Sequence, residues 1–177
     1  MESTLQQIGI KYGTDKAVWH QYCDFYQSNL PGRDFCGRIL ELGVWEGSSI
    51  KMWREYYPLA HIVGVDIIIR PRDIEGVTLV EMDASNPEQL SKLGNFDIIV
   101  DDASHMCSHQ QIAFNQLFNN QLNSGGFYVM EDAQTSFWEM YRDAPETTYN
   151  LMKRYHNHIE FNRDGLNESI SIIIPKK

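Results

Sequence analysis

The sequence is poor in cysteine, has no long apolar run and carries too few basic residues to balance its acidic ones. Its cysteines, Cys23, Cys36 and Cys107, lie far apart, and no Cys-x-x-Cys pair is present. This argues against a disulfide framework and a cysteine zinc site, and we expect a reduced, cytoplasmic chain. No apolar run approaches ~18 residues, and the acidic, polar N-terminus lacks a signal-peptide core, so nothing directs the chain to a membrane.

Charge and length narrow the class of protein further. The 24 Asp and Glu residues outnumber the 15 Lys and Arg residues, which gives a formal net charge of -9. Because proteins bind nucleic-acid backbones through clustered Lys and Arg, we expect no nucleic-acid partner. The 177 residues, 42% of them hydrophobic, fit a single globular domain that spans residues 1–177.

The stretch from Ile39 to Ser49 is the one around which the rest of the chain is organised. An apolar strand over residues 39–42 runs into a turn with Gly43 and Gly47, and a helix is predicted to begin at Ser48. Open α/β sheets use such a corner to place backbone N–H groups beside a nucleotide. The alternative is an ordinary structural corner between a strand and a helix.

The spacing of this turn differs from the two best-known nucleotide motifs. It is Glu41-x-Gly43-x-x-x-Gly47, which matches neither the Gly-x-Gly-x-x-Gly dinucleotide motif nor the P-loop. The turn has no Lys or Arg to face a phosphate, and Glu41 lies near the end of the strand. These features suit a ligand with a positively charged end.

Strand-like runs alternate with helical ones along most of the chain. We predict strands at 61–66, 77–82, 96–100 and 126–130, and helices at 14–26, 48–57, 86–93, 104–122 and 145–155. Two further β-rich runs, 158–162 and 169–175, are joined by turn residues. The predicted fold is therefore α/β: a Rossmann-like, seven-stranded, mostly parallel sheet with helices on both faces and an antiparallel C-terminal hairpin.

Acidic residues follow each of the five predicted parallel strands. Because the carboxyl ends of parallel strands meet at one edge of the sheet, we expect these side chains to form one acidic rim. So many carboxylates repel one another unless cations or hydrogen-bond donors neutralise them, so the rim predicts a positive ligand, a metal ion, or both. The residues are Glu41, Asp66, Asp83, Asp101-Asp102 and Glu131-Asp132.

These strand ends resemble those of class I S-adenosylmethionine-dependent methyltransferases. The resemblance is carried by Glu41-x-Gly43, Asp66, Met82-Asp83-Ala84 and Asp101. Three longer stretches, 12–16 (Tyr-Gly-Thr-Asp-Lys), 101–105 (Asp-Asp-Ala-Ser-His) and 125–136, are similar to the macrolide sugar O-methyltransferases that act on mycinamicin- and tylosin-type deoxysugars.

The resemblance implies an S-adenosylmethionine site along this rim, with residues 1–30 as a helical cap over it. Gly43 and Gly47 would let the backbone approach the amino-acid end of the cofactor, and Asp66 would hold the ribose diol. Asp83 and the Ala84 amide would contact the adenine. The complete set of implied cofactor-binding residues is Tyr12, Thr14, Glu41, Gly43, Gly47, Ser48, Asp66, Asp83, Ala84 and Asp101.

The resemblance also implies a metal ion and a general base. Asp102, Glu131 and Asp132 would hold Mg²⁺, and His105 would accept the proton of the attacking hydroxyl. The implied activity is methyl transfer to a hydroxyl of a sugar or glycosylated small molecule, in a natural product or a surface-polysaccharide precursor. The acceptor is then a small molecule, and a homo-oligomer is compatible with so short a chain.

Several alternatives remain open from the sequence. Asp102 could cap the following helix, with His105 on the surface of that helix. Glu131 and Asp132 could be solvent-exposed residues that follow a strand and bind nothing. His105-x-x-x-His109 also fits a two-histidine metal site. Tyr12-x-x-x-Lys16 and Tyr149-x-x-x-Lys153 both fit the Tyr-x-x-x-Lys pair of short-chain dehydrogenases, but neither lies in the sequence context of that family. The non-enzyme alternative is a chain that binds S-adenosylmethionine without transferring a methyl group, as a partner subunit or regulator.

Overall fold

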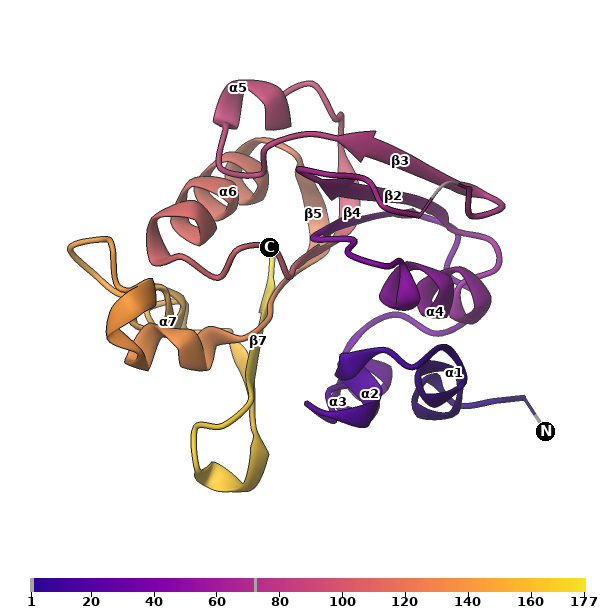
Figure 1. Ribbon diagram of the computed structural model, residues 1–177, viewed down its shortest axis with the longest axis horizontal. Coiled ribbons are helices and arrows are strands. Elements are labelled where there is room, and N and C mark those ends of the chain that lie inside the picture. The colour runs from indigo at the N-terminus through magenta and orange to yellow at the C-terminus, as the bar shows by residue number, and fades with distance from the viewer. Residues whose placement is uncertain (1, 72) are drawn as a thin grey trace.

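A seven-stranded sheet forms the centre of the computed structural model, which describes residues 2–71 and 73–177 (Figure 1). The strand order is β3-β2-β1-β4-β5-β7-β6, and the seven-stranded, mostly parallel sheet that the sequence predicts is confirmed. The strands are β1 (Arg38–Leu42), β2 (His61–Asp66), β3 (Val77–Glu81), β4 (Phe96–Asp101), β5 (Leu122–Met130), β6 (Ile159–Asn162) and β7 (Ile170–Pro175).

Strands β1 to β5 are parallel, and β7 of the C-terminal hairpin runs antiparallel to them. β7 pairs antiparallel with both β5 and β6, which confirms the predicted edge hairpin. The strand order reverses between β1 and β4, which are paired from Ile39 with Ile98 to Leu42 with Asp101. In open α/β sheets ligands bind at such a reversal, outside the carboxyl ends of the strands.

Helices cover both faces of the sheet (Figure 1). One layer contains α1 (Leu5–Tyr12), α2 (Asp15–Val18), α3 (Cys23–Asn29) and α4 (Ser48–Tyr56), and the other contains α5 (Pro87–Leu90), α6 (Cys107–Asn120) and α7 (Thr148–Lys153). Short 3₁₀ turns occur at η1 (Ala133–Phe137), η2 (Glu139–Tyr141) and η3 (Arg163–Gly165). Within residues 2–71 and 73–177, no helix combines the length and the hydropathy needed to span a membrane.

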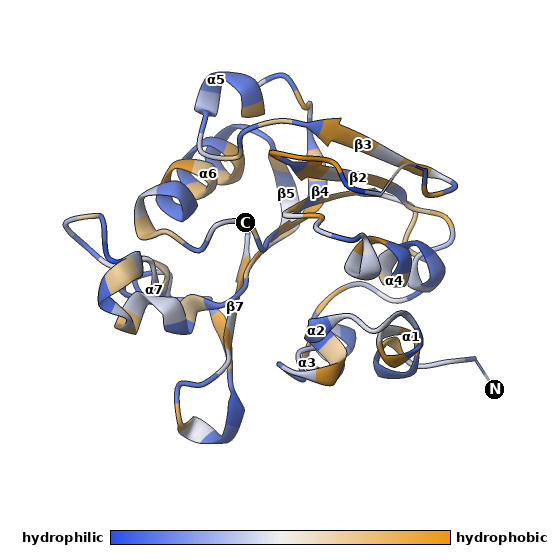
Figure 2. Ribbon diagram, viewed as in Figure 1, coloured by the Kyte–Doolittle hydropathy of each residue, from blue (hydrophilic) through white to orange (hydrophobic). Residues whose placement is uncertain are grey.

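Alternating side chains of each strand divide between two apolar layers. Ile39 of β1 packs into the layer of α1 to α4, whereas Leu40 and Leu42 pack into the layer of α5 to α7. Figure 2 shows the strongly hydrophobic colour of β2 and β3 between bluer helices. Because side chains along a strand point alternately to the two faces of the sheet, this alternation decides which strand-end carboxylates lie on the same face.

The N-terminal region differs from the single helix predicted over residues 14–26. It is divided into α2 and α3 by a turn in which Gln21 has a φ of 62° and Trp19 is 69% exposed. The turn lets Tyr22 enter the core, where it is fully buried. A preceding helix, α1, was not predicted, although Thr4 and Gln7 form a reciprocal capping box at its start.

The helix predicted over 104–122 is also shorter in the structure. α6 begins at Cys107, and β5 already begins at Leu122. His105 has a φ of 59° and lies in the loop before the helix. The loop conformation, rather than a first helical turn, therefore sets the direction of this imidazole.

The single domain that spans residues 1–177 and the role of residues 1–30 as a cap over the cofactor site stay predictions.

Gly43 makes the closest backbone approach in the turn after β1. Its φ is 89°, and a Cβ built on it would lie 2.0 Å from the carbonyl oxygen of Asp102. The Asp102 N–H also donates to the Leu42 carbonyl at 2.9 Å. A side chain at position 43 would therefore force the ends of β1 and β4 apart.

We expect Gly43→Ala to lower the free energy of unfolding by about 3 kcal/mol or more, since it combines backbone strain with a clash against main chain. Gly125→Ala is the matched control, because Gly125 has a φ of 80° but nothing within 4 Å of its Cβ position. We expect it to cost about 1–2 kcal/mol. Urea denaturation measures both, and equal losses would show that the approach to Asp102 is unimportant.

Candidate functional site

A cavity of about 800 Å³ opens at the carboxyl ends of the parallel strands, beside the reversal of strand order. The predicted site residues that line it are Thr14, Gly43, Ser48, Asp66, Asp83, Ala84, Asp101, Asp102, His105 and Asp132. The structure thus brings residues from five strand ends and from the N-terminal region around one space.

Four of the predicted site residues lie outside the cavity lining. The Tyr12 hydroxyl donates to Glu55 at 2.6 Å, and Gly47 caps the start of α4 against Pro71 and Ile74. Glu41 and Glu131 lie beneath the cavity and are buried. Their roles in ligand binding stay predictions.

Asp66 fixes the shape of the turn that follows β1. Its Oδ2 accepts hydrogen bonds from the backbone N–H groups of Val44 at 2.8 Å and Trp45 at 2.9 Å. Burial by itself would raise the pKa of Asp66, but these N–H donors and that of Ile68 lower it below its usual value. The carboxylate therefore stays ionised beside the cavity.

Trp45 and Arg70 form a contact at the cavity that sequence analysis missed. The Arg70 guanidinium lies 4.3 Å from the centre of the Trp45 ring, and both residues line the cavity. Trp45 has a φ of 49°, and its side chain is exposed. An exposed aromatic ring with a cation over it offers a flat surface to a ligand base.

The carboxylates after β3 and β4 occupy different environments. Asp83 accepts hydrogen bonds from the Ser85 N–H and hydroxyl, which lower its pKa. Asp101 is buried and accepts a hydrogen bond from the Tyr128 hydroxyl at 2.9 Å. Burial raises the pKa of Asp101 to about 6, although that hydrogen bond opposes the change.

Asp102, His105 and Asp132 converge at one side of the cavity. One atom from each lies within 4.8 Å of the others, so the group could hold a metal ion. His105 Nε2 is 3.6 Å from Asp132 Oδ2 and 4.0 Å from Asp102 Oδ1. Among the described residues, His105 Nδ1 has no hydrogen-bond partner. Neither ring nitrogen is therefore committed to a short contact within the protein.

Asp132 is oriented by donors on the side away from His105. Its Oδ1 accepts hydrogen bonds from the Tyr22 hydroxyl at 2.8 Å and the Gln134 amide at 3.1 Å, and His20 Nδ1 lies 3.6 Å away. Burial would raise the pKa of Asp132, but His20, His105 and these donors lower it. Oδ2 is left facing His105.

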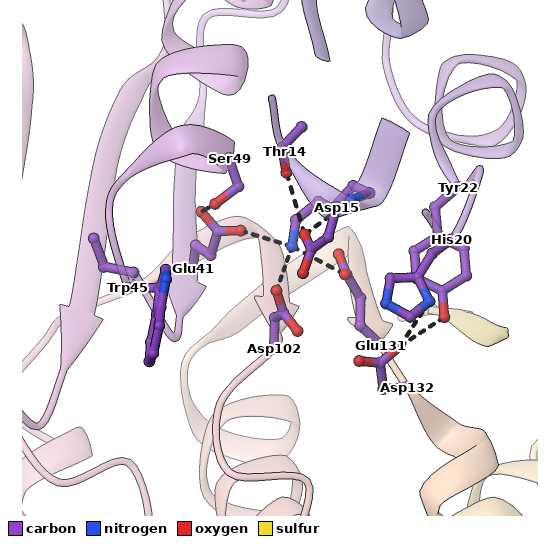
Figure 3. A network of polar contacts seen from close by, with 12 residues as sticks. Thr14, Asp15, His20, Tyr22, Glu41, Trp45, Ser49, Asp102, Glu131 and Asp132 are labelled. Carbon is purple, nitrogen blue, oxygen red and sulfur yellow. Dashed lines mark hydrogen bonds and ion pairs between the residues drawn. The ribbon is translucent and has the colours of Figure 1, made fainter. Parts of the chain in front are cut away.

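Beneath the cavity, Glu41, Asp102 and Glu131 point toward one another from adjacent strand ends (Figure 3). The register places Leu42 beside Asp101 and Asp101 beside Met130. Since side chains alternate along a strand, all three carboxylates face the layer of α1 to α4.

The Lys16 ammonium lies between these carboxylates and is fully buried. Its Nζ pairs with Asp102 Oδ2, with Glu131 Oε2 at 2.9 Å and with Glu41 Oε1 at 3.3 Å. Burial would lower the pKa of Lys16, but the carboxylates of Asp102, Glu131 and Glu41 raise it well above its usual value. Lys16 is therefore charged.

One ammonium cannot offset every acid in this cluster. Burial raises the pKa of Glu41 to about 7 and raises that of Glu131 well above its usual value. Glu131 Oε1 has no hydrogen-bond partner in the described part of the chain. Ser49 supplies a further donor to Glu41 at 3.0 Å.

Sequence analysis missed Lys16, His20 and Tyr22 as parts of the site. The signal for Lys16 was the stretch 12–16, in which a lysine directly precedes the apolar Ala17 and Val18. A lysine that is predicted to face a sheet needs acidic partners, and the strand alternation supplies them. No comparable local signal pointed to His20.

The sheet order, the cavity and the acidic strand ends define the class I S-adenosylmethionine-dependent methyltransferase fold. The chain matches the MycE methyltransferase solved with Mg, SAH and mycinamycin VI, with a TM-score of 0.83 and 25% identity over 99% of this chain and 55% of that one. A fibrillarin/Nop5p structure, 15% identical with a TM-score of 0.63, shares the fold over 89% of this chain and 81% of its own.

Over most of its length the chain is homologous to sugar O-methyltransferases of natural-product pathways. It is 36% identical over 167 residues to 8-demethyl-8-alpha-L-rhamnosyl tetracenomycin-C 2'-O-methyltransferase of Streptomyces olivaceus, covering 85% of this chain and 44% of that protein. It is 35% identical over 153 residues to L-olivosyl-oleandolide 3-O-methyltransferase of Streptomyces antibioticus, covering 77% of this chain and 39% of that protein.

A third relative is mycinamicin VI 2''-O-methyltransferase of Micromonospora griseorubida, with 31% identity over 76% of this chain and 37% of that protein. The chain spans less than half the length of these curated relatives. No family model matches it. Homology therefore covers the region that contains the cavity and the Asp102–His105–Asp132 group.

We expect Tyr22→Phe to lower the free energy of unfolding by about 2 kcal/mol, because it removes the shortest hydrogen bond to the partly buried, charged Asp132 carboxylate. Tyr26→Phe is the matched control, since Tyr26 is equally buried but bonds the neutral Ser171 hydroxyl at 2.9 Å. Its expected cost is about 1 kcal/mol. Denaturant titration compares the two, and an equal or larger loss for Tyr26→Phe would contradict the assigned role of Tyr22.

Proposed function

We propose that this chain carries an S-adenosylmethionine-dependent O-methyltransferase activity toward a hydroxyl of a sugar or glycosylated small molecule. The observation that supports this best is the position of Asp102, His105 and Asp132 on the wall of the same cavity as Gly43, Asp66 and Asp83. Cofactor-type and acid–base residues then share one space, as transfer between two bound molecules requires.

The cavity fits S-adenosylmethionine in size and in its donors and acceptors. A volume of about 800 Å³ lies within the range of ligand sites. The ionised Asp66 carboxylate has lone pairs left for ribose hydroxyls, and the Trp45 ring with Arg70 offers a surface for an adenine. The acidic rim suits a sulfonium, whose charge disappears on transfer.

Asp102 and Asp132 fit a divalent metal ion at the other side of the cavity. Asp102 Oδ1 and Asp132 Oδ2 both face His105, and carboxylate oxygens are the ligands that Mg²⁺ prefers. Glu131 is proposed as a further ligand through its unpartnered Oε1. A bound Mg²⁺ would lower the pKa of an acceptor hydroxyl. The MycE structures that this chain resembles contain Mg and SAH.

His105 is the proposed general base. Its side chain lines the cavity, and its ring nitrogens make no short contact with the described residues. The acceptor hydroxyl would give its proton to His105 as its oxygen bonds to the methyl carbon, while the sulfur–carbon electron pair returns to sulfur. Asp102 and Asp132 would stabilise the imidazolium that results.

The N-terminal residues are proposed to cap the cofactor end of the cavity. Gly13, Thr14 and Asp15 line it, and α2 is joined to the sheet beneath by Lys16. The acceptor is then expected on the side of His105 and Asp132. A sugar acceptor follows from the homologues, whose names describe methylation of sugar hydroxyls.

The activity is tested by incubating the chain with S-adenosylmethionine, Mg²⁺ and a panel of rhamnosyl and deoxysugar glycosides, with product mass as the readout. We expect a gain of one methyl group on at least one glycoside, and its loss with EDTA. Transfer that is insensitive to EDTA would contradict the metal assignment. SAH binding without transfer to any acceptor would favour a silent binding module.

We expect His105→Ala to reduce turnover by roughly a hundredfold or more while SAH affinity changes little. Asp66→Ala is the matched variant from the opposite side of the cavity, and it should weaken SAH binding instead. Steady-state kinetics and calorimetry measure the two effects. Loss of SAH binding in His105→Ala would place His105 in the cofactor site and refute its role as the base.

A further inference from the structure

We propose that Lys16 is the positioning residue for the metal-binding half of the site. It fixes Asp102 and Glu131 from beneath so that Asp102 Oδ1 faces Asp132 Oδ2 and His105. This inference rests on the proposed function, because it concerns the geometry of the proposed metal ligands.

The two oxygens of Asp102 have separate partners. Oδ2 is paired with Lys16 Nζ, and Oδ1 lies on the side of His105. Once one oxygen of a short carboxylate side chain is held, the remaining rotation about its last bond is also fixed. The direction of Oδ1 therefore depends on where the ammonium lies.

Glu131 is held in the same way from the neighbouring strand. Its Oε2 pairs with Lys16 Nζ at 2.9 Å, and its Oε1 has no partner among the described residues. Without the ammonium, Asp102 and Glu131 would present two mutually repelling oxygens across the β4–β5 pair. The natural relief is rotation of one of them away from the other.

Lys16 can hold these carboxylates in place because its own side chain is buried and cannot move freely. Its side chain is fully buried in the layer of α1 to α4, and it contacts carboxylates from β1, β4 and β5. Its helix, α2, begins at Asp15, which lines the cavity together with Thr14. One side chain thus links the N-terminal region to the proposed metal ligands.

A double variant tests the positioning role, because loss of a cation by itself would strengthen the binding of a metal ion rather than weaken it. Lys16→Met combined with Glu41→Gln removes the ammonium together with one of the acids that it contacts, so fewer acids are left without a cation than in Lys16→Met alone. Glu41→Gln alone is the reference, since it carries the same change at residue 41, and the glutamine amide oxygen can still accept from Ser49. Lys16→Met alone would bury uncompensated acids.

The readout is Mn²⁺ binding, measured by electron paramagnetic resonance without turnover, with SAH affinity measured on the same samples by calorimetry. We expect the Kd for Mn²⁺ to rise at least about tenfold in the double variant relative to Glu41→Gln, as for residues that orient metal ligands. The Kd for SAH should stay within about threefold.

Equal Mn²⁺ affinity in the two variants would overturn the proposal. So would a double variant that fails to fold, because Lys16 would then be needed for folding rather than for ligand position. If the unmodified chain does not bind Mn²⁺, the metal half of the proposed function fails, and this inference fails with it. The result on the unmodified chain therefore distinguishes the two failures.

Discussion

The site depends on one buried ammonium among the carboxylates of three adjacent strands. Parallel pairing brings the ends of β1, β4 and β5 to one edge, and the strand alternation turns Glu41, Asp102 and Glu131 toward the same helical layer. Buried acids at such distances repel one another strongly. Lys16 offsets part of that repulsion and contacts all three.

The cavity above this cluster has two halves that meet at the ends of β1 and β4. On one side Asp66 shapes the turn through the Val44 and Trp45 N–H groups. On the other, Asp102 faces His105 and Asp132. Gly43 joins them, since its backbone lies against the Asp102 carbonyl. The distance between the proposed cofactor side and the proposed acceptor side is thus set by main chain, which varies less than side chains do.

The sequence predicted the strands, their mostly parallel arrangement and the acidic rim, because these follow from apolar periodicity and from the polarity of parallel strands. It did not predict that α2 and α3 are separate, since that break is caused by burial of Tyr22 against Asp132, a residue 110 positions away. His105 was placed in a first helical turn, but a left-handed backbone keeps it in the loop. Long-range contacts of this kind leave no local signal.

Lys16 was not identified from the sequence as part of the site. Its carboxylate partners were predicted to form an acidic rim that needs positive charge. A bound ligand or metal ion was expected to supply that charge. The structure assigns part of that charge to the protein itself, because Lys16 lies in the stretch 14–26 that was predicted to be helical and its side chain is buried among these acids.

The central claim is that Asp102 and Asp132 hold a metal ion beside His105 while Lys16 keeps its place beneath them. Anomalous diffraction from crystals grown with Mn²⁺ and SAH tests it most directly. The account predicts one manganese peak between Asp102 Oδ1 and Asp132 Oδ2, with Lys16 still bound to Glu131. A peak in the position of the Lys16 ammonium, or no peak near Asp102, would contradict it.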